Sequence, residues 1–113
     1  MSRKLAMILF IACVSQAGRL LDEKEVNILV TNIPEALKVK SASGCPTPDY
    51  SELGTDLAMV QLRNTCPRSG TGLIGNYVVD RHTGRICKDL DGTMEVDSPH
   101  LQRIRKMLLS NKK

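Results

Sequence analysis

The feature that most constrains this chain is a short turn between two runs of strand-forming residues near residue 80. Tyr77, Val78 and Val79 are aromatic or β-branched residues, which suit a half-buried pleated surface. Residues 80–84 then read DRHTG, in which the aspartate favours a turn and the glycine supplies a left-handed backbone position. Residues 85–87 read RIC and form the return strand. The pattern predicts a β-hairpin.

The same residues predict how the two strands pair. A loop at residues 81–84 places Val79 opposite Ile86 and sets the opposite charges of Asp80 and Arg85 beside them. One face of the sheet is then the core face, and we expect it to carry Leu73, Tyr77, Val79 and Ile86, with Val60 and Leu62 from the preceding strand.

A family resemblance rests on this hairpin. The run YVVD-x-x-TG-x-I at residues 77–86 resembles the closing hairpin of PepSY-like domains, which are small exported bacterial modules. The resemblance implies helices packed on an antiparallel sheet, and a binding or inhibitory role. It covers the hairpin alone and assigns no functional residue.

The N-terminus has the pattern of an export signal. Arg3 and Lys4 precede an apolar run at residues 5–14, and residues 15–17 read SQA, which suits a cleavage site. The apolar run is shorter than the about 20 residues that span a bilayer. We expect a signal peptide at 1–17 and a single secreted or periplasmic domain at 18–113, with no integral membrane span after processing. Alternatively, the run FIAC resembles a lipoprotein box that would anchor the protein through an acylated Cys13.

Length and charge narrow the class of partner. A chain of 113 residues forms one domain, and its modest core would benefit from a disulfide. The chain has 16 basic and 12 acidic residues. Removing residues 1–17 takes away Arg3 and Lys4, so 14 basic residues remain against 12 acidic ones, a net charge of +2. This small excess predicts no nucleic-acid partner.

The segment 22–40 can be read in two ways. Asp22 and Glu25 have the spacing of a capping box, and apolar residues recur at helical spacing after them. The run VNILVTNI is also rich in β-branched residues, which leaves a strand open. We favour a helix near 23–32 and a second helix from Pro34, because proline suits a first helical turn. Residues 41–54 are rich in serine, glycine and proline and predict a loop.

Three cysteines follow the signal peptide, so one of them stays unpaired within the chain. In a meander, Cys66 and Cys87 lie on strands about 10 Å apart, beyond the reach of a disulfide. Cys45 lies in the predicted loop and can approach either partner. We favour Cys45–Cys66, with Cys45–Cys87 as the alternative. Cys87 is then a buried free thiol that packs as a small apolar side chain.

The glycine-rich stretch at residues 70–75 matches the spacing GxGxxG, but a strand follows it where a dinucleotide site needs a helix. No cofactor is therefore expected. Backbone N–H groups in this stretch are instead a candidate anion site. The residues assigned to that site are Arg63, Arg68, Gly70 and Gly72.

Catalytic and metal chemistry have little support in the sequence. A thiol-dependent or hydrolytic enzyme would have to use Cys87, His82 or the acidic segment 89–97, and local spacing puts neither histidine beside a cysteine. No CxxC or HxxxH spacing predicts zinc, and the acidic segment, expected to be a solvated loop, lacks the order of an EF-hand.

The C-terminal segment predicts an amphipathic helix. Ser98 is a good N-cap and Pro99 suits the first turn. One helical face would carry Leu101, Ile104, Met107 and Leu108. The opposite face would carry Gln102 and a candidate surface-binding group, Arg103, Arg105 and Lys106.

These patterns predict an α+β fold with N-terminal helical segments, a three-stranded antiparallel β-meander and a C-terminal amphipathic helix. The function expected is a non-enzymatic exported interaction or inhibitory module that binds a protein or envelope component. The alternatives are a small thiol-dependent or hydrolytic enzyme and a lipid-anchored or cationic envelope-binding protein.

Overall fold

The computed structural model describes residues 20–66, 72–88 and 94–110. Along the chain it has α2 (Glu23–Val30), α3 (Pro34–Ser41), β1 (Pro46–Leu53), β2 (Leu57–Asn64), β3 (Gly72–Asp80), β4 (Ile86–Lys88), β5 (Met94–Val96) and α4 (Pro99–Ser110). The predicted signal peptide and Cys13 lie outside the described residues. Within the described ranges, no helix has the length and apolar character needed to cross a membrane.

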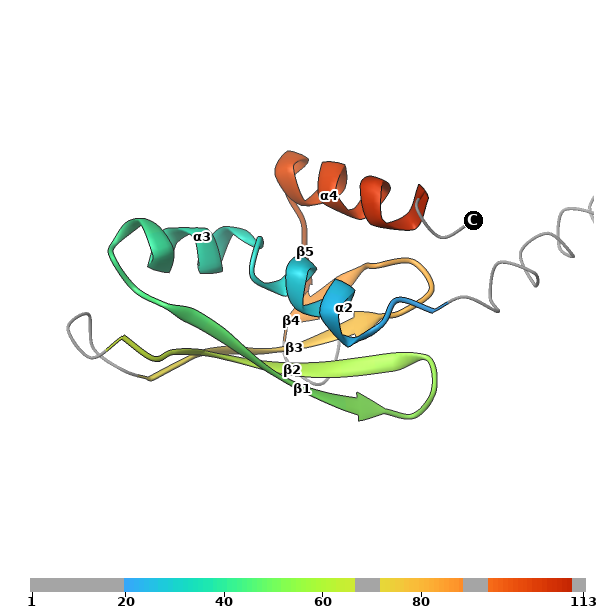
Figure 1. Ribbon diagram of the computed structural model, residues 1–113, viewed down its shortest axis with the longest axis horizontal. Coiled ribbons are helices and arrows are strands. Elements are labelled where there is room, and N and C mark those ends of the chain that lie inside the picture. The colour runs from blue at the N-terminus through green and yellow to red at the C-terminus, as the bar shows by residue number, and fades with distance from the viewer. Residues whose placement is uncertain (1–19, 67–71, 89–93, 111–113) are drawn as a thin grey trace, which may run out of the picture.

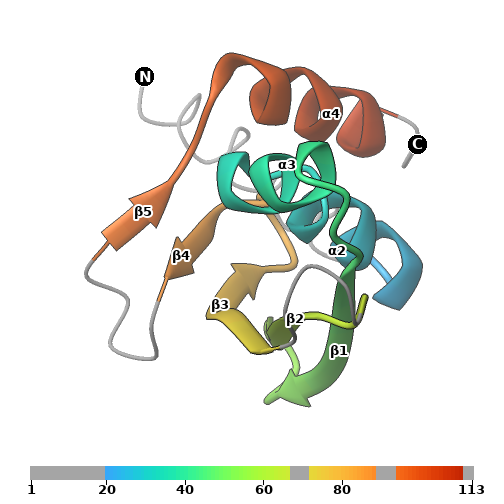
Figure 2. The same cartoon turned by 90° about the vertical axis from the view of Figure 1, so that its left-hand side faces the viewer.

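The strands form one antiparallel sheet in the order β1-β2-β3-β4-β5, and the three helices lie on one side of it (Figures 1 and 2). The predicted α+β class and meander are confirmed. The predicted number of strands is wrong, because the sheet has five strands where three were expected. The two additional strands are the edges, β1 and β5.

Strand β1 lies where a loop was predicted. Over its first six residues the side chains alternate between half-buried and exposed, as in a strand that lies against helices on one side. Pro46 and Pro48 suggested a loop because proline has no N–H to donate to a sheet ladder. At an edge this restriction is harmless, since β1 pairs with β2 alone.

Strand β5 lies within the acidic segment that was predicted to be a solvated loop. It is three residues long, and its pairing with β4 places Glu95 beside Cys87. Its central carboxylate accepts two hydrogen bonds from Arg85, at 3.0 Å and 2.6 Å. A strand this short gives no measurable alternation in the sequence, so the pattern could not reveal it.

Helices α2 and α3 form as predicted. Asp22 and Glu25 make a reciprocal capping box at the start of α2, with both bonds at 2.9 Å. Helix α3 begins at Pro34, whose missing N–H needs no partner in a first turn. The β-branched residues Val26 and Val30 of α2 are tolerated because they are buried against the sheet and α4.

The core lies between the sheet and the helices. Its fully buried members are Leu21, Val26, Leu29, Val30, Ile33, Ala36, Ala58, Val60, Leu62, Tyr77, Val79, Ile86 and Leu101. The predicted pairing of Val79 with Ile86 is confirmed. The placement of Leu73 on the core face is wrong, and its side chain is 52% exposed.

A register shift explains the exposure of Leu73. Leu62 pairs with Gly75, but Arg63 pairs with Leu73, so Ile74 is an extra residue on β3. Such a bulge moves every residue beyond it to the other face of the sheet. Leu73 therefore lies on the same side as Arg63, while Ile74 packs against the core.

Helix α4 begins as predicted, with Ser98 Oγ accepting the N–H of Leu101 at 3.0 Å. Its apolar face is narrower than expected, because Leu101 is buried but Met107 is 55% exposed. Arg105 was assigned to the polar surface, yet its side chain is only 14% exposed. Its aliphatic stem packs over Gly84, which illustrates how a long cation can cover apolar surface.

Candidate binding surface on the uncovered side of the sheet

No described helix covers the second side of the sheet, which we call the open face (Figure 1). The strand register places one residue from each strand in a line across this face. The line runs Ser51, Met59, Val78, Cys87 and Glu95, each paired with the next. Its three central members are apolar, and we call Met59, Val78 and Cys87 the central row.

The central row departs from the usual pattern of a half-covered sheet. Antiparallel sheets with one solvated side normally place polar residues there. Here the three side chains of the row are half-buried, as is Leu57 at the start of β2. Leu53 lies beside it and is 43% exposed. The open face therefore has an apolar centre about three strands wide.

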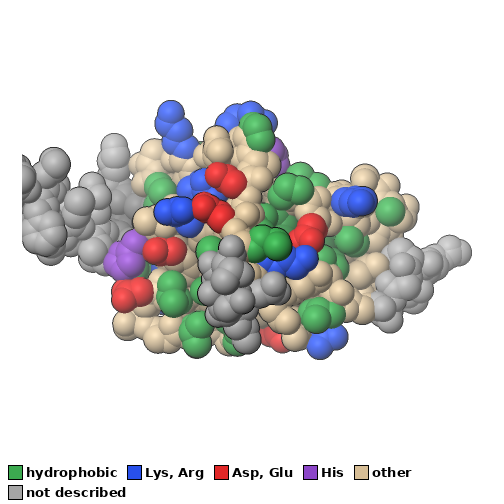
Figure 3. Space-filling model, turned by 180° about the vertical axis from the view of Figure 1, so that it is seen from behind, with side chains coloured by type: hydrophobic (Ala, Val, Ile, Leu, Met, Phe, Trp, Pro, Cys, Tyr) green, Lys and Arg blue, Asp and Glu red, His purple; other side chains and the backbone are tan. Residues whose placement is uncertain are grey.

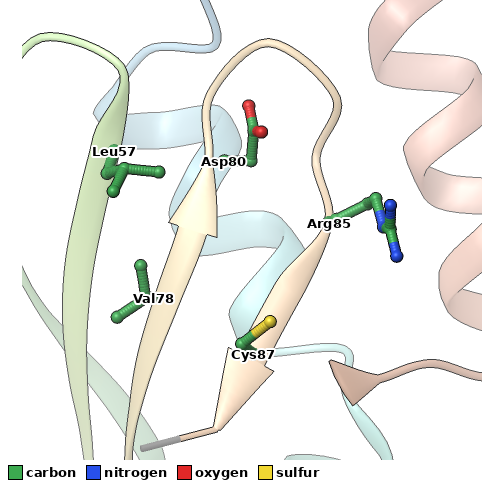
Figure 4. A pocket seen from close by; sticks show the side chains of 5 residues that line it. All are labelled: Leu57, Val78, Asp80, Arg85 and Cys87. Atoms are coloured by element: carbon green, nitrogen blue, oxygen red, sulfur yellow. The ribbon is translucent and has the colours of Figure 1, made fainter. Parts of the chain in front are cut away.

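A shallow cavity of about 320 Å³ lies at one end of the central row (Figure 4). It is lined by Leu57, Val78, Asp80, Arg85 and Cys87. The guanidinium of Arg85 points away from Leu57 and Val78, toward β5 (Figure 4). Its bonds lower the pKa of the Glu95 carboxyl, despite the opposing effect of burial. The cavity floor is thus apolar, and its charged groups lie at the margin.

A second depression of about 200 Å³ lies on the other side of Met59, lined by Asp49, Ser51, Met59, Gln61 and Asn76. Two of its polar side chains, Gln61 and Asn76, are joined by a hydrogen bond. Gln61 donates to Asn76 at 3.3 Å and accepts from Arg63 at 3.0 Å. The open face therefore combines an apolar centre with a polar margin, as protein interfaces do.

The cysteines pair as favoured from the sequence. Cys45 and Cys66 form a disulfide with a Cα–Cα distance of 5.1 Å, and Cys87 is free. The alternative pair Cys45–Cys87 is wrong. Cys87 is also less buried than expected, because it lies opposite Val78 on the open face and not beside Ile86 in the core.

The predicted anion site is only partly described. Arg68 and Gly70 lie outside the described residues. Arg63 is exposed on the open face, and Gly72 pairs with Asn64 in the β2–β3 ladder. The described part of this site therefore contains one cation, Arg63, and no cluster of cations.

The last glycine of the same stretch has a structural role that the sequence did not indicate. The ring of Tyr77 lies over Gly75, where a Cβ atom would come within 2.6 Å of the phenol oxygen. A side chain at position 75 would displace this ring. The glycine therefore makes room for an aromatic residue two positions further along the strand.

The position of the Tyr77 ring matters because Tyr77 belongs to a polar cluster under α3. Its hydroxyl donates to Glu35 Oε1, and Lys88 Nζ donates to Glu35 Oε2 at 2.8 Å. Burial alone would raise the pKa of Glu35, but the bonds from Lys88 and Tyr77 outweigh it and the pKa is lowered. Sequence separations of 42 and 53 residues left no local signal for this cluster.

The histidines are engaged away from the free thiol. The His82 ring contacts Asp56 at 2.8 Å, and the His100 ring contacts Asn32 at 3.0 Å. The residues that line the cavity around Cys87 include no histidine. Among the described residues, no group of three or more histidine, cysteine, aspartate or glutamate side chains could hold a metal ion.

The predicted surface-binding group on α4 is divided by the fold. Arg103 and Lys106 are exposed. Arg105 donates to the carbonyl of Gly84 at 3.1 Å and to Asp97 at 3.3 Å. Two of the three cations thus face outward, and the third joins α4 to the β3–β4 turn.

Comparison with protein-family models, curated proteins and solved structures yields no match. The PepSY-like resemblance of residues 77–86 therefore stays a prediction, and the interpretation of function rests on the molecule's own surfaces.

Proposed function

We propose that this chain is a non-enzymatic, exported binding module that holds a protein partner on its open face. The observation that carries the proposal is the central row of Met59, Val78 and Cys87. Three apolar side chains in register across neighbouring strands form a continuous strip, and a partner that covers the strip removes apolar surface from water.

The margin of the open face supports the same function. Asp80 and Arg85 lie at one side of the strip, and Asp49, Gln61 and Asn76 lie at the other. Glu95 lies at its β5 end. Polar groups at the rim of an interface set orientation and selectivity, while the apolar centre supplies most of the affinity.

Capture of a partner from the envelope of the exporting cell tests the proposal. Met59→Gln replaces an apolar centre by a polar side chain of similar length, and we expect it to weaken capture about tenfold. Met94→Gln makes the same change at an exposed methionine on the helix side of β5 and should leave capture unaltered. Absence of any captured protein, or equal loss in both variants, would contradict the proposal.

The free thiol gives a second measurement. Cys87 lies within the strip, so a bound partner should slow its alkylation by iodoacetamide, followed on the peptide that contains it. Cys87→Ala should retain capture. If that variant instead abolished a turnover activity measured with the wild type, a thiol-dependent enzyme would replace the binding module.

A further inference from the structure

A different surface of the molecule carries basic residues. Lys38 and Lys40 are exposed on α3, and Arg103 and Lys106 are exposed on α4. These four cations lie in the helix layer, and we call them the cationic helix surface. Arg103 and Lys106 are one turn apart and share a face of α4, whereas Lys38 and Lys40 are two positions apart and project from different sides of α3. Basic side chains project from the upper edge of the molecule, and other basic side chains lie lower, among the acidic ones (Figure 3).

No acidic side chain that the structure describes neutralises the charge of this surface. Helix α4 has no acidic residue, and the only acidic residue of α3, Glu35, is bonded to Tyr77 and Lys88. By contrast, Arg81, Arg85 and Arg105 all bond to acidic side chains. Among the described residues, none of the four surface cations has an acidic partner within salt-bridge distance.

An exposed apolar side chain lies beside the α4 cations. Met107 is four residues after Arg103, so the two are neighbours on one face of α4, and Met107 is 55% exposed. Basic residues beside an apolar side chain on a helix suit the boundary between lipid headgroups and acyl chains. An acidic protein would pair with the cations but would gain little from Met107.

We infer that the cationic helix surface binds an anionic membrane surface, with the open face of the sheet turned away from the lipid. The two surfaces lie on opposite sides of the sheet and share no residue, so lipid and protein partner can be held together. The inference uses other residues than the proposed function and does not depend on it.

Sedimentation with lipid vesicles tests the inference. We expect binding to phosphatidylcholine vesicles that contain phosphatidylglycerol, no binding to phosphatidylcholine alone, and loss of binding at high salt. Lys106→Gln should weaken vesicle binding about fivefold, since each basic residue near an anionic membrane surface contributes a factor of about five to the affinity. All variants share the same N-terminus, so differences between them report the folded surface.

Arg63→Gln is the matched control, because it removes one positive charge from the open face. It should leave vesicle binding unchanged, as should Met59→Gln. Equal losses in Arg63→Gln and Lys106→Gln, or absence of binding to anionic vesicles, would overturn the inference. Soluble polyglutamate tests the alternative partner, an acidic polymer. If polyglutamate binds as tightly as the vesicles, and Met107→Gln weakens the binding of neither, the surface binds acidic polymers and the lipid inference fails.

Discussion

The carboxylate of Glu35 shows how one residue can join a helix to a sheet. It lies in the first turn of α3 and receives hydrogen bonds from Tyr77 on β3 and Lys88 on β4. Because the cluster holds the ionised form, the pKa of Glu35 is lower in the folded protein than its ordinary value of 4.5. The ionised carboxylate therefore contributes stability above that value, and the contribution is lost as the pH falls through the folded pKa.

Glu35→Gln should destabilise the protein by about 1 kcal/mol at pH 7, a modest figure because the carboxylate is partly exposed to solvent. Urea unfolding at a series of pH values measures the effect. The difference from the wild type should shrink as the pH is lowered below 4.5. In a Tyr77→Phe background the substitution should cost less, because one of the two donors is already absent. A difference that grows at low pH would contradict the argument.

Gly75→Ala tests the space that the Tyr77 ring occupies. The added methyl group would overlap the ring, so we expect a loss of about 1–3 kcal/mol in the free energy of unfolding. Gly54→Ala is the control: no atom lies within 4 Å of its Cβ position, and it bears only the strain of a positive φ of 77°. That strain costs about 1–2 kcal/mol. Only Gly75→Ala should also disturb the Tyr77–Glu35 bond, which tyrosine absorbance reports.

At the scale of elements, local signals decided what could be predicted. Asp22, Pro34 and Ser98 mark the starts of the described helices in the sequence. Helices α2 and α4 begin at the residue after Asp22 and Ser98, and α3 begins at Pro34 itself. The edge strands have no such signals. Strand β1 contains two prolines, and β5 has three residues, so each owes its pairing to a neighbour that the local sequence does not reveal.

Ser98→Ala should destabilise the protein by about 1 kcal/mol, because the N–H of Leu101 loses its partner at the start of α4. Ser110→Ala, at the far end of the same helix, provides the comparison. Its hydroxyl bonds to the carbonyl of Met107 in an exposed position, so removal should change stability by less than about 0.5 kcal/mol. Thermal or urea unfolding of both variants measures this difference, and equal effects would show that Ser98 is not an effective cap.

For the whole molecule, the order of strands and the choice of disulfide were predictable and the binding surface was not. The hairpin at residues 77–87 implied a meander, and the meander in turn excluded Cys66–Cys87. Prediction of the central row required more information than the hairpin provides. The pairing of Met59 with Val78 follows only from the register of β2 on β3, and the bulge at Ile74 shifts that register in a way no turn residue signals.

Reduction of Cys45–Cys66 should lower the free energy of unfolding by about 3 kcal/mol. This is the stabilisation expected when a disulfide reduces the entropy of the unfolded chain by closing a loop of this size. The bond spans 21 residues and closes the open end of the β1–β2 hairpin. Urea unfolding with and without reductant measures the loss. In the double variant Cys45→Ser/Cys66→Ser, reductant should have no effect, whereas sensitivity in that variant would point to Cys87.

The strand order has a kinetic consequence. Each strand of the sheet pairs with its neighbours in the chain, and no connection crosses over another strand. Short loops close at little entropic cost, so the ladders can form one after another from any hairpin. The widest separation is bridged when α4 packs on α2 and Leu101 enters the core. Folding of this chain should therefore be limited by the arrival of its last helix and not by the assembly of its sheet.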